Sequence, residues 1–412
     1  MATIQISRLF LYPIKSCAGL PVSQATLIET GFQYDRLWMV TDEKYKFVTQ
    51  IKEGRLALVT PKIIGIPALQ CGLHLEGTVG MEELESGDTT TPQLILTIPA
   101  TPTTDEAPEA TSLTTPATTT TTTTSSMILP LHPTEVELAG LKKVQVHVWG
   151  DDTPAYDEGD EVADWLSTFL GRRVRLVRYI LDQGKRATKT CPPTAEQVQQ
   201  ALASPEDDND SGSSNRDPAA TTLPPRPVGG WRSIFSYFAP SSASHSTTTP
   251  PPPQWPGRVM FSNDSPILLA SEASLVDVNQ HLPTPIDIRR FRPNIMVDGI
   301  APFEEDTWHR ISIKAGALAR KITPPISSSE EKITVDADTN ASTSAPSAVT
   351  LMVTSRCTRC PMTNNNPDTG IASLEHQPLK TLVNYRRVDP GDKYRGCFGM
   401  NCVPVRTGKY CS

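Results

Sequence analysis

Two cysteines three residues apart, Cys357 and Cys360, are the side chains in this sequence best suited to hold a metal. An apolar, β-branched run at residues 349–353 leads into them, and an arginine precedes each cysteine. A cation beside a thiol lowers its pKa, so we expect a thiolate here, which is the ligand that soft metals prefer. The arginines also suit a bound anion. The Pro-Asp-Thr-Gly segment at 367–370 predicts a turn, so the cysteines should lie at the rim of a sheet, facing a cleft.

Five further segments accompany the cysteine block. They are Leu-Tyr-Pro-Ile-Lys-Ser-Cys at 11–17, Tyr-Asp-Arg-Leu-Trp-Met-Val at 34–40, Phe-Ser-Asn-Asp-Ser-Pro at 261–266, Ser-Glu-Ala-Ser-Leu at 271–275 and Phe-Arg-Pro-Asn-Ile at 291–295. In this order the six blocks resemble the MOSC domain of molybdenum cofactor sulfurases and amidoxime-reducing components. The first two are similar to signatures of the β-barrel domain that precedes MOSC. One block alone would be a weak signal, but six in order are specific.

The resemblance implies a molybdenum cofactor, in which a pterin carries a phosphate and a dithiolene. Cys360 matches the protein ligand to molybdenum, and Cys357 is then a structural or neighbouring thiol. Arginine suits the phosphate because its planar fork gives bidentate bonds, and Pro293 fixes the relative direction of its two polar neighbours. The positions matching the family's cofactor-binding residues are Lys15, Ser16, Arg36, Asp264, Ser265, Arg292, Asn294, Thr358, Arg359 and Cys360.

Two other kinds of site fit the cysteines. Cys357 and Cys360 could join Cys397 and Cys402 as four zinc thiolates, or act as a redox dithiol. On spacing alone zinc and molybdenum are equally favoured, because Cys-x-x-Cys is a general metal and redox signature. The spacing of Cys397 and Cys402 is loose for a zinc knuckle, and the other five blocks have no role in a zinc ribbon. The molybdenum interpretation is therefore favoured.

The resemblance implies an oxidoreductase similar to amidoxime-reducing components, acting on small N-hydroxylated substrates. Its electrons would come from a separate haem or flavin protein, since no such domain is evident here. A second interpretation is a cofactor carrier or handling module similar to the sulfurase C-terminal part. A third is a degenerate, non-catalytic homologue. The family continues beyond the block at 398–405 with a closing segment that is not found before Ser412, which predicts an open barrel with unpaired strand edges.

Composition narrows the class of protein. The net charge of −7 gives no general basic footprint for nucleic acid. No apolar run approaches the roughly 20 residues that cross a bilayer, and the N-terminus has no secretory pattern. Eight cysteines without such a signal indicate reduced thiols. We therefore expect a cytoplasmic location or an association with mitochondria, and no transmembrane segment.

The predicted fold is β-rich α+β, in two β-barrel domains. We expect a MOSC N-terminal β-barrel domain at residues 1–180, a low-complexity insertion at 181–256 and a MOSC domain at 257–412 with its last strands missing. The 38 prolines and the 38% hydrophobic content indicate that part of the chain cannot be packed core. Segments poor in large apolar residues, expected outside the core, run from about 97 to 126, 193 to 256 and 327 to 347.

Hydrophobic patterning predicts the individual elements. Helical spacing occurs at 157–170, ending before Gly171, at 271–281 with Ser271 as N-cap, and at 378–385. Short alternating or β-branched runs predict strands at 4–12, 25–29, 37–41, 56–60, 94–98, 143–149, 174–179, 295–297, 311–313 and 351–354.

Overall fold

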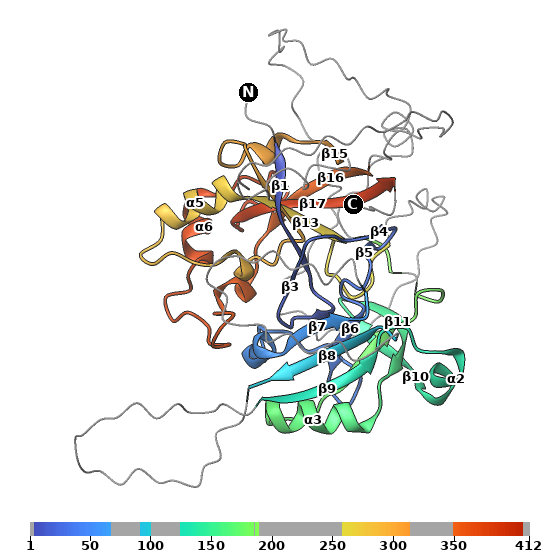
Figure 1. Ribbon diagram of the computed structural model, residues 1–412. Coiled ribbons are helices and arrows are strands. Elements are labelled where there is room, and N and C mark those ends of the chain that lie inside the picture. The colour runs from blue at the N-terminus through green and yellow to red at the C-terminus, as the bar shows by residue number, and fades with distance from the viewer. Residues whose placement is uncertain are drawn as a thin grey trace, which may run out of the picture.

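The computed structural model describes residues 4–66, 91–99, 124–184, 186–188, 258–313 and 349–406 (Figure 1). These residues form a β-rich α+β structure whose strands assemble into four sheets. The segments predicted at 193–256 and 327–347 lie outside the described residues.

The largest sheet has seven strands and occupies the upper half of Figure 1. Strands β13 and β14 run parallel, and all other neighbours in this sheet are antiparallel. In spatial order the strands are β15 (Arg310–Ile313), β16 (Val349–Thr358), β17 (Cys397–Arg406), β13 (Ile267–Ser271), β14 (Ile295–Asp298), β1 (Gln5–Leu11) and β3 (Leu20–Val22).

Three smaller sheets complete the described β-structure. The five-stranded sheet contains β10 (Lys142–Val148), β11 (Asp151–Asp157), β12 (Arg175–Tyr179), β6 (Trp38–Thr41) and β2 (Ile14–Lys15), in this order. The three-stranded sheet contains β7 (Thr60–Ile64), β8 (Gln93–Ile98) and β9 (Ser125–Pro130), and the hairpin contains β4 (Leu27–Ile28) and β5 (Gly31–Phe32).

The helices begin and end where local chemistry predicts. In α3 (Asp160–Leu170) the side chains of Val162, Leu166 and Phe169 are buried, and Gly171 ends the helix at a positive φ of 64°. The hydroxyl of Ser271 caps α5 (Glu272–Gln280) by accepting a bond from the third backbone N–H of the helix. Helix α2 (Glu135–Gly140) starts with a capping box, and α6 (Leu379–Tyr385) follows a proline. Short 3-10 helices are η1 (Gly54–Leu58), η2 (Ile288–Arg290), η3 (Glu304–Thr307) and η4 (Pro361–Asn364).

The chain first passes from the seven-stranded to the five-stranded sheet through a very short connection. Strand β1 belongs to the seven-stranded sheet and β2 to the five-stranded sheet, and only Tyr12 and Pro13 separate the two strands. Strand β3 then returns to the seven-stranded sheet. Residues around Tyr12 are therefore held between the two largest sheets, and their side chains can meet residues from both halves of the chain.

Several predictions of local structure were wrong. Residues 56–60 were expected as a strand, but 54–58 form η1, because short apolar runs do not distinguish a strand from a buried helical turn. The expected non-core segment 97–126 includes the end of β8 and the start of β9, which pair with each other. The predicted helix at 157–170 begins at Asp160, because the preceding residues pair in β11.

The predicted barrels differ from what is observed. Among the described residues the seven-stranded sheet is open, with β15 at one edge and β3 at the other. Alternating patterns identify strands but not whether the first and last strands pair, because that contact is remote in sequence. The sequence predicted an open barrel with unpaired strand edges beyond the block at 398–405. The sheet is open, but its edges are β15 and β3, because β17 pairs with both β16 and β13.

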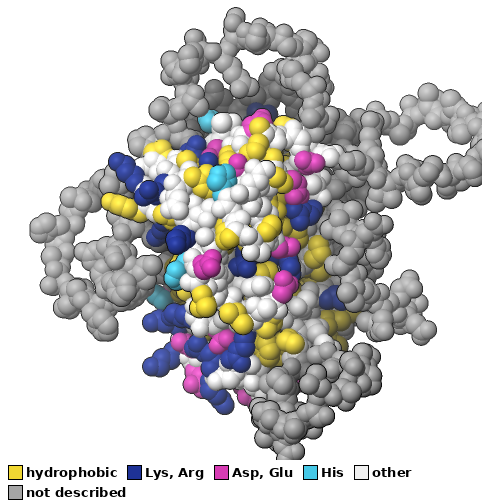
Figure 2. Space-filling view, turned by 90° about the vertical axis from the view of Figure 1, so that its left-hand side faces the viewer, with side chains coloured by type: hydrophobic (Ala, Val, Ile, Leu, Met, Phe, Trp, Pro, Cys, Tyr) yellow, Lys and Arg dark blue, Asp and Glu magenta, His cyan; other side chains and the backbone are white. Residues whose placement is uncertain are grey.

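The surface carries mixed charge. On the face in Figure 2, basic and acidic side chains are interspersed, and basic ones gather toward its lower left. This agrees with the small net charge of −7 for a chain of 412 residues. No helix within the described ranges is long and apolar enough to span a membrane.

Candidate cofactor-binding site

Lys15 and Ser16 stand at the end of the connection between the two large sheets. Ser16 adopts a φ of 69°, in the left-handed region, and turns the chain directly after β2. The Lys15 ammonium is buried and donates to the carbonyl oxygen of Phe261 at 2.8 Å and to the amide oxygen of Asn263. Burial and the cation of Arg186 lower the pKa of Lys15 well below its ordinary value. A bound anion beside it would act in the opposite direction and favour the charged form.

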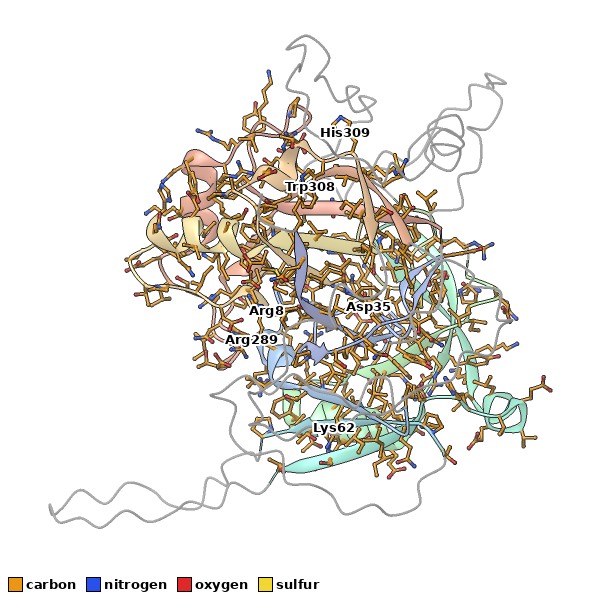
Figure 3. All side chains as sticks on the ribbon, turned by 45° about the horizontal axis from the view of Figure 1, so that its top comes forward. Arg8, Asp35, Lys62, Arg289, Trp308 and His309 are labelled. Carbon is orange, nitrogen blue, oxygen red and sulfur yellow. The ribbon has the colours of Figure 1, made fainter. Side chains whose placement is uncertain are left out.

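A buried carboxylate, Asp35, organises the neighbouring groups at the centre of the molecule (Figure 3). It accepts bonds from the backbone N–H of Tyr12 at 2.8 Å, from the amide of Asn294 at 3.0 Å and from the guanidinium of Arg36. The amide oxygen of Asn294 accepts a second bond from Arg36 at 3.0 Å. The rest of this amide bonds to the backbones of β1 and β13. Arg36 is thus held by two buried partners.

Two arginines pack against one tyrosine. The guanidinium carbons of Arg36 and Arg292 lie 4.5 and 4.2 Å from the ring centre of Tyr12. One nitrogen of Arg292 donates to the carbonyl of Cys17, and its other terminal nitrogen has no hydrogen-bond partner among the described residues. Burial lowers the pKa of Arg292 to about 10. A Cβ on Gly19 would lie 2.4 Å from the Tyr12 ring, so glycine is required for this close packing.

Arg359 connects the end of β16 to the loop before β14. It donates to the carbonyl of Phe291 at 2.7 Å and contacts the thiol of Cys357 at 2.9 Å. The ring of Phe291 stacks on Phe398 with centres 4.0 Å apart, which fixes the carbonyl that Arg359 uses. The Nε of Arg359 is buried without a partner in the described part of the chain. This residue therefore retains a donor for a ligand.

Cys360 follows β16 directly and starts the 3-10 helix η4 as its N-cap residue. Thr358, two residues earlier, is the last residue of β16 and pairs with Cys397 of β17. Cys357 and Cys360 are both of intermediate exposure as whole residues, but the thiol of Cys357 is itself buried. The expected thiolate is wrong for Cys357, because burial raises its pKa more than the adjacent Arg359 lowers it. The cysteines do lie at the end of a strand, as predicted.

The four-thiolate zinc site does not assemble. Cys402 pairs with Val353 of β16, whereas Cys397 pairs with Thr358, and both of these cysteines are buried. Burial raises the pKa of the Cys397 thiol to about 11. In the described ranges, no three His, Cys, Asp or Glu side chains are placed to share one metal ion.

Asp264 and Ser265 approach the site from the segment before β13. Asp264 follows Asn263, whose amide oxygen accepts from Lys15, and its negative charge raises the pKa of both Lys15 and Cys357. The hydroxyl of Ser265 instead donates to the carbonyl of Cys402 at 2.7 Å. The segment therefore brings one carboxylate to the site and ties itself to β17.

One member of the cluster was missed from sequence. Arg186 is 2% exposed, forms an ion pair with Asp151 at 3.3 Å and donates to the carbonyl of Ser262 at 3.0 Å. Its other terminal nitrogen is buried with no partner among the described residues. The residue lies at the start of the range predicted as low-complexity insertion. Its partners are remote in sequence, so no local motif marked it.

The donors left unused suit an anionic ligand rich in acceptors. Arg186, Arg292 and Arg359 each keep a buried nitrogen, and Tyr12 a buried hydroxyl, without a hydrogen-bond partner among the described residues. Buried donors are normally paired, so a group of them indicates a ligand that accepts hydrogen bonds. A partly exposed thiol, Cys360, follows the last of these arginines directly. The residues therefore fit a phosphate-bearing cofactor whose metal takes one protein thiolate.

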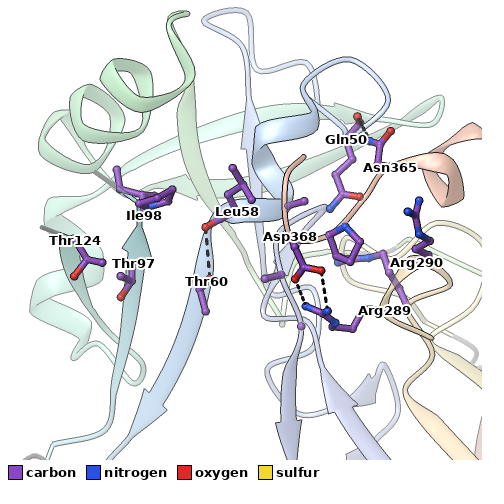
Figure 4. A pocket seen from close by; sticks show the side chains of 16 residues that line it. Gln50, Leu58, Thr60, Thr97, Ile98, Thr124, Arg289, Arg290, Asn365 and Asp368 are labelled. Carbon is purple, nitrogen blue, oxygen red and sulfur yellow. Dashed lines mark hydrogen bonds and ion pairs between the residues drawn. The ribbon is translucent and has the colours of Figure 1, made fainter. Parts of the chain in front are cut away.

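A cavity of about 410 Å³ borders this cluster (Figure 4). Of the ten predicted residues only Arg292 lines it. The rest of its wall comes from the loop after β2, the segment that leads into η1, η1 itself, the three-stranded sheet, η2 and the loop after η4. The cavity is thus adjacent to the cluster rather than identical with it.

Fold and cluster together define a β-rich protein in which two sheets enclose a buried cationic junction beside a cysteine. A family model described as the MOSC N-terminal beta barrel domain matches residues 3–113, and one described as the MOSC domain matches residues 256–409. The chain therefore belongs to the MOSC-domain proteins that carry the MOSC N-terminal domain.

Relatives extend over most of the chain. Mitochondrial amidoxime-reducing component 1 of Mus musculus is 25% identical over 393 residues, covering 94% of this chain and 73% of its own. The Homo sapiens protein of the same name is also 25% identical, covering 94% and 74%. Molybdenum cofactor sulfurase of Bos taurus is 24% identical over 332 residues, covering 78% of this chain and 25% of its own.

Proposed function

We propose that this protein binds the molybdenum cofactor and reduces small N-hydroxylated substrates with electrons from a partner protein. The observation that carries the proposal is the group of buried arginines with unused donors, of which Arg359 directly precedes Cys360. The similarity to amidoxime-reducing components supports the substrate class. It also supports an association with mitochondria.

Each part of the junction has a distinct role in this proposal. Cys360 would hold the metal through its thiolate, and Arg292 and Arg359 would bind the anionic part of the pterin cofactor through their free nitrogens. Lys15 would become charged when the anion is bound, because the anion offsets the burial that lowers its pKa. Asp35 and Asn294 orient Arg36 and act through it. Ser16, Asp264, Ser265 and Thr358 complete the proposed set.

The bound cofactor would supply a two-electron redox centre. Reduction of an amidoxime breaks its N–O bond, consumes two electrons and two protons, and yields an amidine and water. A haem or flavin protein would deliver the electrons. The chain's own residues bind the cofactor, fix its orientation and limit the access of water, since most of the cationic groups are buried.

The division of the chain remains part of the proposal. We assign residues 1–180 to the MOSC N-terminal domain, 181–256 to an insertion and 257–412 to the MOSC domain. Strands β1 and β3 of the first part complete the sheet of the last part. The cofactor would lie where the chain passes between these two parts.

A second candidate is a cofactor carrier or handling module. The similarity to molybdenum cofactor sulfurases favours it, because one such match covers 78% of this chain. A carrier would bind the cofactor without turnover. A third candidate is a degenerate homologue, which would bind the cofactor weakly or show no turnover because it lacks a functional group.

Metal analysis and turnover together test the proposal. We expect protein made in a host that synthesises the cofactor to carry about one molybdenum per chain and no stoichiometric zinc, and to release a fluorescent pterin on oxidation. With reduced methyl viologen as electron source it should convert benzamidoxime to benzamidine. Zinc without pterin would refute the cofactor assignment. Molybdenum and pterin without any conversion would leave the carrier as the better description.

A further inference from the structure

The cavity beside the cofactor cluster has its own charge pattern. Three arginines of one short segment, Arg289, Arg290 and Arg292, line it (Figure 4). Arg292 belongs to the cofactor cluster described above. Arg289 and Arg290 do not, and they lie on η2, which faces the loop that follows η4.

Arg289 is already neutralised. It donates to both carboxylate oxygens of Asp368, at 2.8 and 3.2 Å, and to Asp287 at 3.0 Å (Figure 4). Its side chain is 41% exposed and that of Asp368 is 64% exposed. Arg289 and its two carboxylate partners form a charge-balanced cluster at the rim of the cavity, which offers little attraction to an added anion.

Arg290 differs from its neighbour. It is half-buried, and within the described ranges its hydrogen bond is to a neutral group, the carbonyl of Asn364 at 2.8 Å. No carboxylate among the described residues forms an ion pair with it. Burial lowers its pKa, while Asp368 and Asp287 act in the opposite direction from a greater distance. The cavity wall therefore contains a partly desolvated cation whose charge is not balanced by contact.

The same arginine is linked to the proposed metal ligand. Its partner Asn364 is the last residue of η4, and Cys360 is the N-cap of that helix. A 3-10 helix rises about 2 Å per residue, so Asn364, whose carbonyl holds Arg290, stands roughly 8 Å along η4 from Cys360. A ligand group at Arg290 could thus belong to a molecule that reaches the reacting centre.

The wall is also preorganised. The Asn365 amide donates to the buried carbonyl of Gln50 at 2.6 Å. The backbones of Gly54 and Gly370 meet so closely that a Cβ on Gly54 would lie 1.9 Å from the Gly370 oxygen. These two contacts join the loop after η4 to the segment before η1. The cavity walls are therefore fixed before any ligand enters.

We propose that this cavity binds the part of the substrate remote from its N–O bond, and that Arg290 selects substrates carrying a carboxylate or phosphate group there. The inference rests on the proposed function and specifies its substrate class. A guanidinium holds either anion through two parallel bonds. A volume of about 410 Å³ lies in the range of small-molecule sites, and Leu58 and Ile98 supply apolar wall for the body of the substrate.

Substrate selectivity of the loaded protein tests the inference. Reduced methyl viologen would drive reduction of benzamidoxime, 4-carboxybenzamidoxime and 4-phosphonobenzamidoxime, and the ratio of kcat/KM for each anionic substrate to that for benzamidoxime would be compared between variants. A charge-assisted contact corresponds to about 10- to 100-fold. We expect at least one ratio well above one in the wild type and a fall of about that factor in Arg290→Gln. The two anionic substrates distinguish a carboxylate site from a phosphate site.

A matched control and a second substitution keep the result interpretable. Arg173 is exposed and paired with Glu43 on the other half of the molecule, so Arg173→Gln should leave every ratio unchanged. Arg290→Lys keeps the charge without the planar fork and should give intermediate ratios. Wild-type ratios near one, or ratios unaffected by Arg290→Gln, would overturn the inference.

Binding separates this inference from the proposed function. Benzamidine and 4-carboxybenzamidine are products and cannot be reduced at an N–O bond, so calorimetric titration of the loaded protein measures the cavity alone. We expect 4-carboxybenzamidine to bind more tightly, and Arg290→Gln to remove about 10-fold or more of that advantage. Equal affinities would refute the role of Arg290 even if turnover occurs. Absent turnover with a retained binding difference would refute the oxidoreductase proposal alone.

Discussion

Replacing Asn294 by alanine should destabilise the protein and loosen its cofactor together. The side-chain amide can make four hydrogen bonds, and it makes all four. It donates to the Phe10 carbonyl at 3.2 Å and to Asp35 at 3.0 Å, and accepts from the Leu268 N–H at 3.2 Å and from Arg36 at 3.0 Å. Asn294 is 1% exposed. It therefore joins β1, β13 and the Asp35–Arg36 pair at one buried point.

The size of the effect follows from these partners. Two bonds go to neutral backbone groups, each contributing about 0.5–1.5 kcal/mol, and two go to charged side chains, each contributing about 1.5–3 kcal/mol. Water entering the space left by the truncated side chain would replace some of these hydrogen bonds and recover part of the lost free energy. We expect Asn294→Ala to lower the free energy of unfolding by about 3–5 kcal/mol, which is unusually large for one substitution. Arg36 would lose its hydrogen bond to Asn294 and should therefore hold the cofactor less tightly.

Thermal unfolding of the cofactor-free protein measures the first effect. At roughly 2–4 °C per kcal/mol, the midpoint should fall by about 6–20 °C. Asn279→Ala is a matched control, because that amide bonds only to the backbone N–H and carbonyl of Ile286 in a half-buried loop. Its expected cost is about 1–2 kcal/mol. If the two variants unfolded within 2 °C of each other, with roughly equal cofactor content, the central role given to Asn294 would be refuted.

Further predictions concern the cations and the thiols. Arg36→Ala and Arg292→Ala should each raise the cofactor dissociation constant by about 10- to 100-fold, because each removes a charge-assisted contact; unchanged molybdenum content after extended dilution would contradict this. Cys360→Ala should abolish amidoxime reduction, whereas Cys357→Ala should retain a substantial part of it. Loss of a thiol that neighbours a metal ligand lowers metal affinity or activity by only about 10–100-fold. Equal loss of activity in both variants, with electron delivery not limiting, would favour a dithiol or zinc site. The pKa of Lys15 is lowered in the folded protein, so between that lowered pKa and the ordinary value of 10.5 the unfolded chain binds more protons than the folded chain, and folding gains stability as pH rises toward 10.5. The cofactor-free Lys15→Met variant should lack this gain, so its stability relative to wild type should fall as pH rises toward 10.5. A pH-independent difference in urea unfolding would show that the pKa of Lys15 is not lowered by folding.

Much of the local structure around the proposed site could be predicted from the sequence, because motifs are local. Residues 11–17 and 353–360 place a lysine, a serine and two cysteines at strand ends, and these segments do end strands. Ser271 and Gly171 bound their helices for equally local reasons, a hydroxyl that accepts from the first turn and a residue that tolerates positive φ.

Other features could not be read from neighbouring residues. The role of Arg186 depends on the carbonyls of Met260 and Ser262, more than 70 positions away. The state of Cys357 depends on burial, which outweighs the adjacent arginine that the sequence shows. Local pattern also could not choose between a strand and a 3-10 helix for η1, since both bury the same short apolar run.

By itself the sequence determined the strand-rich character, the capped helices and the family of the chain, because these follow from side-chain period, cap chemistry and ordered motifs. Only the tertiary structure decided that β1 leaves the first part of the chain to pair with β14, that Arg36 and Arg292 both pack on the ring of Tyr12, and that the arginine segment at 289–292 lines a cavity beside η4. The physical reason is the sequence separation of the residues that fix each feature. A cap or an alternation is fixed by residues a few positions apart, whereas pairing, burial and the balance of charge depend on groups that only folding brings together.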